Sequence, residues 1–63
     1  MGLGQKIKAK RKELRMPQEE LAALSGVSER TLRDFERGKL SISLQKALDI
    51  AEVLGLELKL VEA

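Results

Sequence analysis

Two short helical patterns that meet at a glycine constrain the fold of this chain more than any other feature. The first pattern covers residues 18–25 and carries Leu21, Ala22 and Leu24 toward one side at helical spacing. Gly26 follows directly and can take the left-handed conformation that commonly closes a helix. Because a helix this short is unstable in isolation, we expect it to pack against the second helix and the rest of the chain.

The second pattern runs from Ser28 to Arg37. Ser28 is a good N-cap residue, and Gly38 ends the pattern in the same way as the glycine before it. Leu32 and Phe35 share one arc of this helix and are expected to anchor it to the core. A short helix, a tight glycine turn and a second short helix make up a helix-turn-helix, whose second helix lies in the DNA major groove.

The opposite arc of this second helix carries charges of both signs. At about 100° per residue, the members of this outward arc are Glu29, Arg30, Arg33, Asp34 and Arg37. Arginine can fork onto guanine O6 and N7, and carboxylates can accept from cytosine N4 or hold the arginines in place. Charged arcs on surface helices are most often simply solvated, but the helix-turn-helix context favours base contacts. We therefore expect Glu29, Arg30, Arg33 and Asp34 to face DNA bases.

Phosphate contacts are expected around the same helix. Ser43 is a good N-cap for a further helix over residues 44–54, whose wide apolar side, beginning at Leu44, predicts a largely buried element. Polar groups at helix ends commonly bind the DNA backbone. The residues placed for phosphate contact are Gln18, Arg37, Lys39, Ser41 and Ser43.

An internal ion pair is predicted from an arginine within an apolar stripe. A first helix over residues 4–14 places Ile7, Arg11 and Leu14 on one side. A long basic side chain there can extend to water or meet a carboxylate at the edge of the core. Because Glu36 lies on the inner edge of the second helix of the motif, we expect Arg11 to pair with it.

Composition excludes several classes of protein. The chain has 63 residues, which favours one domain, and it has no Cys and no His. Disulfides and the common zinc, haem and iron–sulfur sites are thereby excluded, so we expect no metal and no cofactor. There is no phosphate-binding loop and no paired-carboxylate pocket, and we therefore expect no enzymatic activity.

The basic charge is concentrated at the start of the chain. Residues 1–15 hold six basic side chains and one acidic side chain, a net charge of +5, whereas the whole chain has a net charge of +2. Such asymmetry indicates an anionic partner. There is neither an apolar run of transmembrane length nor a signal peptide, so we expect a soluble cytoplasmic protein that does not bind membranes.

The C-terminal tail changes period. Leu56, Leu58 and Leu60 alternate with charged residues after a glycine, a pattern that favours a half-buried strand over a fifth helix. A lone strand needs a partner, and the rest of the chain offers none. We therefore predict a helix-turn-helix domain over residues 1–55 and a strand over residues 56–63 that pairs with the same strand of a second copy.

Residues 3–55 resemble the Xre family of Cro/repressor-type helix-turn-helix proteins. The matching stretches are LGQKIK at 3–8 with the arginine at 11, QEELA at 18–22, SGVS at 25–28, FERGK at 35–39, SL at 43–44 and IAEVLGL at 50–56. The resemblance implies an all-α DNA-binding domain of five or four helices, compact, lambda-repressor-like and in our prediction with four. It also implies that the domain acts as a homodimer on a palindromic operator in double-stranded DNA. It implies base-facing or groove-facing positions for Ser28, Glu29, Arg30, Arg33 and Asp34. For Gln18 it implies a phosphate contact and a role in ordering the recognition helix. It also matches Arg11 and Glu36 to the family's internal ion pair.

Two departures and one further resemblance refine this interpretation. Pro17 stands where the family usually has Ser or Thr, and Ile42 where it often has Pro. The tail over residues 54–61 is similar to the C-terminal strand of HipB-like antitoxins, which pair through it. This favours a repressor that acts as the autoregulating antitoxin of a toxin–antitoxin operon, with a cognate toxin as a partner. A stand-alone or phage-type repressor and a protein-binding adaptor remain alternatives.

Overall fold

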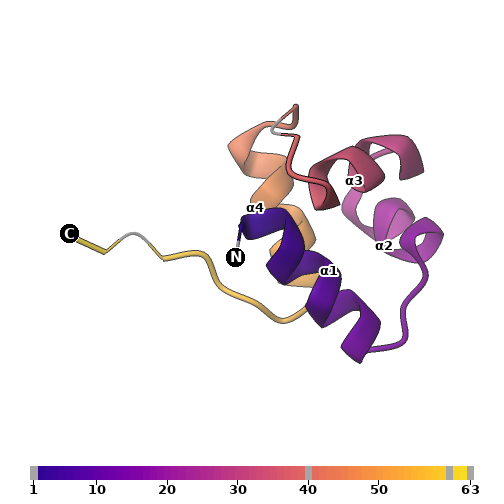
Figure 1. Cartoon of the computed structure of the whole chain (residues 1–63), viewed down its shortest axis with the longest axis horizontal. Helices are drawn as coiled ribbons and strands as arrows, with labels where there is room; N and C mark the ends of the chain where they lie inside the picture. The colour runs from indigo at the N-terminus through magenta and orange to yellow at the C-terminus, as the bar shows by residue number, and fades with distance from the viewer. Residues whose placement is uncertain (1, 40, 60, 63) are drawn as a thin grey trace.

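The computed structural model of the chain describes residues 2–39, 41–59 and 61–62. Four helices follow one another along these residues: α1 (Leu3–Glu13), α2 (Gln18–Ser25), α3 (Glu29–Glu36) and α4 (Leu44–Val53). Figure 1 shows them gathered into one bundle, with the C-terminal tail leaving it. The all-helical arrangement agrees with the predicted fold class, and each helix lies within one or two residues of its predicted range.

Caps and backbone conformations explain where the helices begin and end. The side chain of Ser28 accepts a hydrogen bond from the backbone N–H of Thr31, and Ser43 caps α4 in the same way. Gly26 has a φ of 72° and closes α2 in the left-handed conformation. At the end of α1, Arg15 takes the left-handed region with a φ of 56°, where glycine would be less strained.

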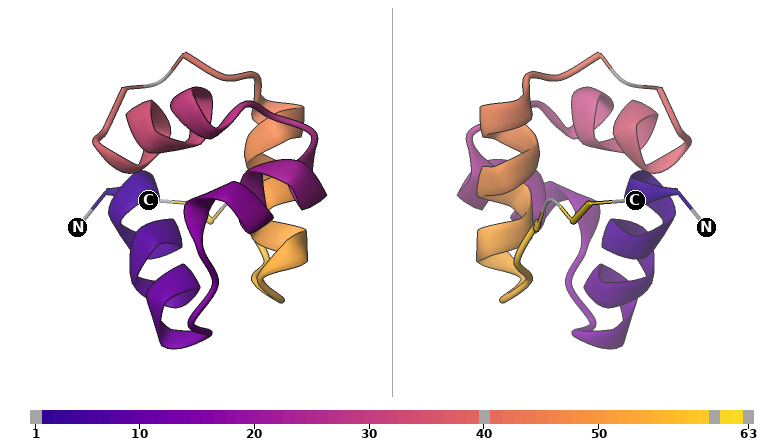
Figure 2. Two further views of the ribbon diagram at one scale, coloured as in Figure 1. Left: turned by 90° about the vertical axis from the view of Figure 1, so that its right-hand side faces the viewer. Right: turned by 90° about the vertical axis from the view of Figure 1, so that its left-hand side faces the viewer.

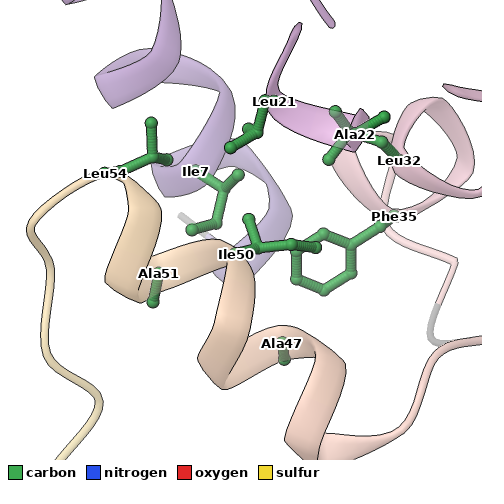
Figure 3. Close-up of a cluster of buried hydrophobic side chains, with 9 residues drawn as sticks. All are labelled: Ile7, Leu21, Ala22, Leu32, Phe35, Ala47, Ile50, Ala51 and Leu54. Carbon is green, nitrogen blue, oxygen red and sulfur yellow. The ribbon is translucent and has the colours of Figure 1, made fainter. Parts of the chain in front are cut away.

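A single apolar core joins the four helices (Figure 3). Helix α2 packs against both α3 and α4, and α1 packs against α3. Phe35 of α3 is the largest of the side chains that are fully buried. The core side chains are Ile7, Leu21, Ala22, Leu32, Phe35, Ala47, Ile50, Ala51 and Leu54.

Helices α1 and α3 touch through their backbones at a glycine. A Cβ placed on Gly4 would collide with the carbonyl oxygen of Phe35 and would lie 3.1 Å from the Cα of Glu36. Only glycine allows this approach, because any side chain would push the two helices apart. The start of α1 is therefore held against the end of α3.

Three leucines that were predicted to point inward are exposed. Leu24 is 60% exposed on α2, Leu44 is 72% exposed at the start of α4, and Leu14, just beyond α1, is also exposed. Leu24 lies near the end of a helix of only eight residues, whose neighbours α3 and α4 cover Leu21 and Ala22. Leu44 and Leu14 lie at helix ends, where no other helix extends far enough to cover them.

The described part of the tail, residues 56–59 and 61–62, contains no strand. Leu56 and Leu58 are half-buried against the core, and Leu60 lies outside the described residues. A strand needs a partner for its backbone hydrogen bonds, and the single chain supplies none. The predicted C-terminal strand is therefore not part of the monomer fold.

Candidate nucleic-acid interface

Helix α3 lies at one end of the molecule, away from the C-terminal ends of α1 and α4 (Figure 2). Its inner side is fixed by Leu32 and Phe35, which are fully buried. On the outward arc, Glu29, Arg30, Arg33 and Arg37 are exposed and Asp34 is half-buried. The structure therefore presents these five side chains on one surface, as the helical spacing predicts.

The arginines of the outward arc are only weakly engaged within the chain. Arg33 Nη2 lies 3.8 Å from Glu29 Oε1, a loose contact between two exposed side chains. Among the described residues, neither Arg30 nor Arg37 forms an ion pair. Their guanidinium groups can therefore donate to an external acceptor without first breaking an internal contact.

A buried network beneath α3 joins its last residue, Glu36, to α1 and to the start of α2. Arg11 Nε donates to Glu36 Oε2 over 2.7 Å, and Arg11 Nη2 donates to Glu36 Oε1 over 3.0 Å. Arg11 Nη1 also donates to the carbonyl oxygen of Met16 over 2.9 Å. Both charged side chains are almost fully buried, with Arg11 7% and Glu36 4% exposed. This forked pairing satisfies both carboxylate oxygens, which burial of a charge requires.

Gln18 connects the start of α2 to the same carboxylate. Its Nε2 donates to Glu36 Oε1 over 3.0 Å. An amide nitrogen carries two hydrogens, so the second one remains for a further acceptor such as a phosphate oxygen. Sequence reasoning found the Arg11–Glu36 pair but missed both this bond and the bond to the Met16 carbonyl. Neither depends on residue spacing alone, since both need the position of the turn before α2.

The other expected contact residues differ in how available they are. Lys39, Ser41 and Ser43 are exposed, and the Ser43 hydroxyl already accepts from the backbone of Lys46 as a cap. The Ser28 hydroxyl is engaged twice, because it accepts from the Thr31 N–H and donates to Thr31 Oγ1 over 2.8 Å. A base contact by Ser28 would compete with the cap of α3.

The described part of the chain shows no sign of two other features, a metal site and a membrane-spanning helix. No group of His, Cys, Asp and Glu there is arranged to hold a metal ion. No helix among these residues is long and apolar enough to cross a membrane.

Comparison with known proteins identifies the family of this chain. The family model described as helix-turn-helix matches residues 7–61, which includes all of α2, α3 and α4. A relative from Methanothermobacter thermautotrophicus, named an uncharacterized HTH-type transcriptional regulator, is 47% identical over 51 residues, which cover 81% of this chain and 74% of the relative. The chain therefore belongs to the helix-turn-helix family, of the Xre type that its sequence resembles.

Proposed function

We propose that this protein is a sequence-specific DNA-binding regulator of transcription that inserts α3 into the major groove. The observation that carries the proposal is the outward arc, where Arg30 and Arg37 form no ion pair among the described residues while the opposite side of the helix is anchored in the core. A rigidly held helix with free guanidinium groups meets the geometric demand of base readout. The family match and the name of the relative support the same role.

Different residues of the outward arc contact bases and phosphates. Arg30 and Arg33 fork onto guanine, while Glu29 and Asp34 repel phosphate and so penalise a wrong register. Arg37 and Lys39 neutralise backbone phosphates beside the groove. Because the arc mixes both signs, selectivity between sequences is its main contribution, and long-range attraction comes from other basic residues.

The regulator acts as a homodimer on a palindromic operator. One recognition helix reads one half-site, and a two-fold axis places a second helix about 34 Å away, one turn of DNA. The tail supplies the contact between copies, because Leu56 and Leu58 alternate with charged residues at the period of a strand. Pairing with a second tail would give this segment the backbone partner that the monomer lacks.

Repression within a toxin–antitoxin operon is the biological setting that we favour, because the tail is similar to that of HipB-like antitoxins. A stand-alone or phage-type repressor is the nearest alternative. A protein-binding adaptor would be favoured if Glu29 and Asp34 held the arginines. The 3.8 Å contact of Arg33 with Glu29 is too loose to favour that alternative.

A gel-shift assay with genomic fragments at two salt concentrations tests DNA binding. Arg30→Ala is expected to lower specific affinity by roughly 10- to 100-fold and to relax the sequence preference. Arg37→Ala is expected to weaken binding to all sequences and to reduce the salt slope by about one. Arg15→Ala, which removes an exposed arginine outside the arc, is the matched control. Absence of specific retention, or an affinity independent of salt, would contradict the proposal.

Sedimentation equilibrium tests the dimer. Leu58→Lys replaces the central tail leucine with a charge and is expected to yield monomers, whereas Val61→Lys alters a side chain that is already exposed. Far-UV circular dichroism establishes that both variants are folded. A folded Leu58→Lys variant that remains dimeric would exclude the tail as the dimer contact. Inhibition of a toxin encoded by the neighbouring gene would separate an antitoxin from a stand-alone repressor.

A further inference from the structure

A hollow of about 380 Å³ lies between the end of α2 and the C-terminal half of α4. Figure 2 shows that the C-terminal end of α4 and helix α3 lie at opposite ends of the molecule. The outward arc of α3 takes no part in this hollow. The residues that line it are Leu24, Ser25, Asp49, Glu52 and Val53.

Apolar surface in the hollow is left uncovered by the fold. Leu24 is 60% exposed although Leu21 and Ala22 of the same helix are buried, and Val53, which also lines the hollow, is half-buried. Burying a leucine side chain stabilises a contact by about 1.5–3 kcal/mol. An exposed leucine next to a half-buried valine therefore offers apolar surface to an apolar side chain of a partner.

A buried polar group in the same hollow lacks a hydrogen bond. Ser25 is only 4% exposed, and its hydroxyl is the buried side-chain group of the described residues that has no hydrogen-bond partner. Buried hydroxyls are nearly always paired, because an unpaired one destabilises the fold. Because the hydroxyl oxygen has almost no accessible surface, a partner in the hollow reaches it only if the end of α2 moves.

The charge of the hollow differs from that of α1 and of the outward arc. Its two charged residues are both acidic, Asp49 and Glu52. Asp49 accepts from Gln45 and lies 3.8 Å from Lys46, whereas Glu52 forms no ion pair among the described residues. The Glu52 carboxylate is therefore available to a basic partner, whereas Asp49 already faces Lys46.

We propose that this hollow is a docking site for a segment of another protein that presents an apolar side chain flanked by lysine or arginine. The apolar side chain would pack on Leu24 and Val53, and the basic residues would face Asp49 and Glu52. Because the hollow and the outward arc lie on different parts of the molecule, the partner can bind while α3 occupies DNA. The proposal goes beyond DNA binding and holds or fails independently of it.

Titration of the isotope-labelled chain with a synthetic peptide tests the site by nuclear magnetic resonance. The probe is an amphipathic peptide of about four helical turns built from leucine and lysine, and its counterpart replaces lysine by glutamate. Saturable shifts are expected for the backbone amides that line the hollow, with the lysine peptide only. Leu24→Ser is expected to weaken this binding about tenfold and Glu52→Lys about fivefold.

Glu62→Lys is the control for Glu52→Lys, since it makes the same change of charge at an exposed position outside the hollow. Unchanged binding by this control supports a local role for Glu52. Shifts centred on α1 or α3, equal binding of the glutamate peptide, or unchanged binding by a folded Leu24→Ser variant would each overturn the proposal. Concentration-dependent shifts of the same amides without peptide would also overturn it, because a second copy would then occupy the hollow.

Discussion

Substitution of Arg11 tests how this small domain holds its recognition helix. Arg11 donates twice to Glu36, over 2.7 and 3.0 Å, and once to the Met16 carbonyl over 2.9 Å. Removing one partner of a buried ion pair costs about 3–5 kcal/mol, because the other charge is left buried and uncompensated. A domain of this length has a free energy of unfolding of about 3–9 kcal/mol. Arg11→Ala should therefore remove a large part of the stability.

Lys10→Ala is the matched comparison on the neighbouring residue. Lys10 Nζ lies 3.4 Å from Glu13 Oε1 in an exposed pair on the same helix. Exposed pairs of this kind contribute less than about 1 kcal/mol. The two variants each remove one basic residue from α1, so the difference between them isolates the effect of burial.

The double variant separates a buried pair from a merely well-packed side chain. Arg11→Met and Glu36→Leu each leave one charge without its partner, whereas the combination leaves none. Replacing both members of a buried ion pair by apolar residues is often nearly neutral. We expect the double variant to be more stable than either single variant, by about 2 kcal/mol, which would appear as a positive coupling in the mutant cycle.

Urea denaturation followed by far-UV circular dichroism measures these effects. With a slope near 1 kcal/mol per molar urea for a small domain, Arg11→Ala should lower the midpoint by about 3 M. Measurements at two protein concentrations separate folding from any association. Equal midpoints for Arg11→Ala and Lys10→Ala, or a double variant whose loss equals the sum of the single losses, would refute the reasoning.

Three further substitutions test local features of the fold by thermal denaturation. Gly4→Ala should lower the free energy of unfolding by about 2 kcal/mol, because its Cβ would strike the Phe35 carbonyl, whereas Gly2→Ala, with open space around it, should have almost no effect; equal melting temperatures would contradict the close approach. Arg15→Gly should raise stability by about 1 kcal/mol, because glycine adopts a φ of 56° without strain, and a lower melting temperature would show that the arginine side chain has a structural role. Ser25→Ala should also raise it by about 1 kcal/mol by removing an unpaired buried hydroxyl, and a loss of stability would indicate a hydrogen bond in solution.

Local signals in the sequence were sufficient for the helices and for the ion pair. Gly26 and Ser28 set the turn between α2 and α3, because a left-handed glycine and an N-cap act within a few residues of themselves. The Arg11–Glu36 pair was predictable because a charge on an apolar stripe needs a partner, and only a few inward positions carry a carboxylate. The turn was thus predictable because its interactions are local. The ion pair was predictable because few carboxylates lie where the inward-facing arginine could reach them.

Depth of burial was not predictable in the same way. Helical periodicity assigned Leu24 and Leu44 to an inner side, but it does not say whether another helix extends far enough to cover them. The close approach of two helices at Gly4 was not predictable either, because an isolated glycine in a helix indicates only that some close contact exists. The contact itself depends on how α1 crosses α3. The strand predicted for the tail would need a second chain to pair with, so the fold of a single chain does not test it.

Helix α2 is the element that the two proposed sites share. Its first residue, Gln18, donates to Glu36 and has a second N–H for phosphate, while Leu24 and Ser25 at its other end line the hollow. An eight-residue helix is about 12 Å long, more than the screening length of about 8 Å at physiological salt. Direct electrostatic coupling between a basic partner in the hollow and a phosphate held by Gln18 is therefore weak. Any coupling must pass through a shift of α2 itself, and it would act equally in both directions, so that a partner that strengthens DNA binding is itself held more tightly on DNA.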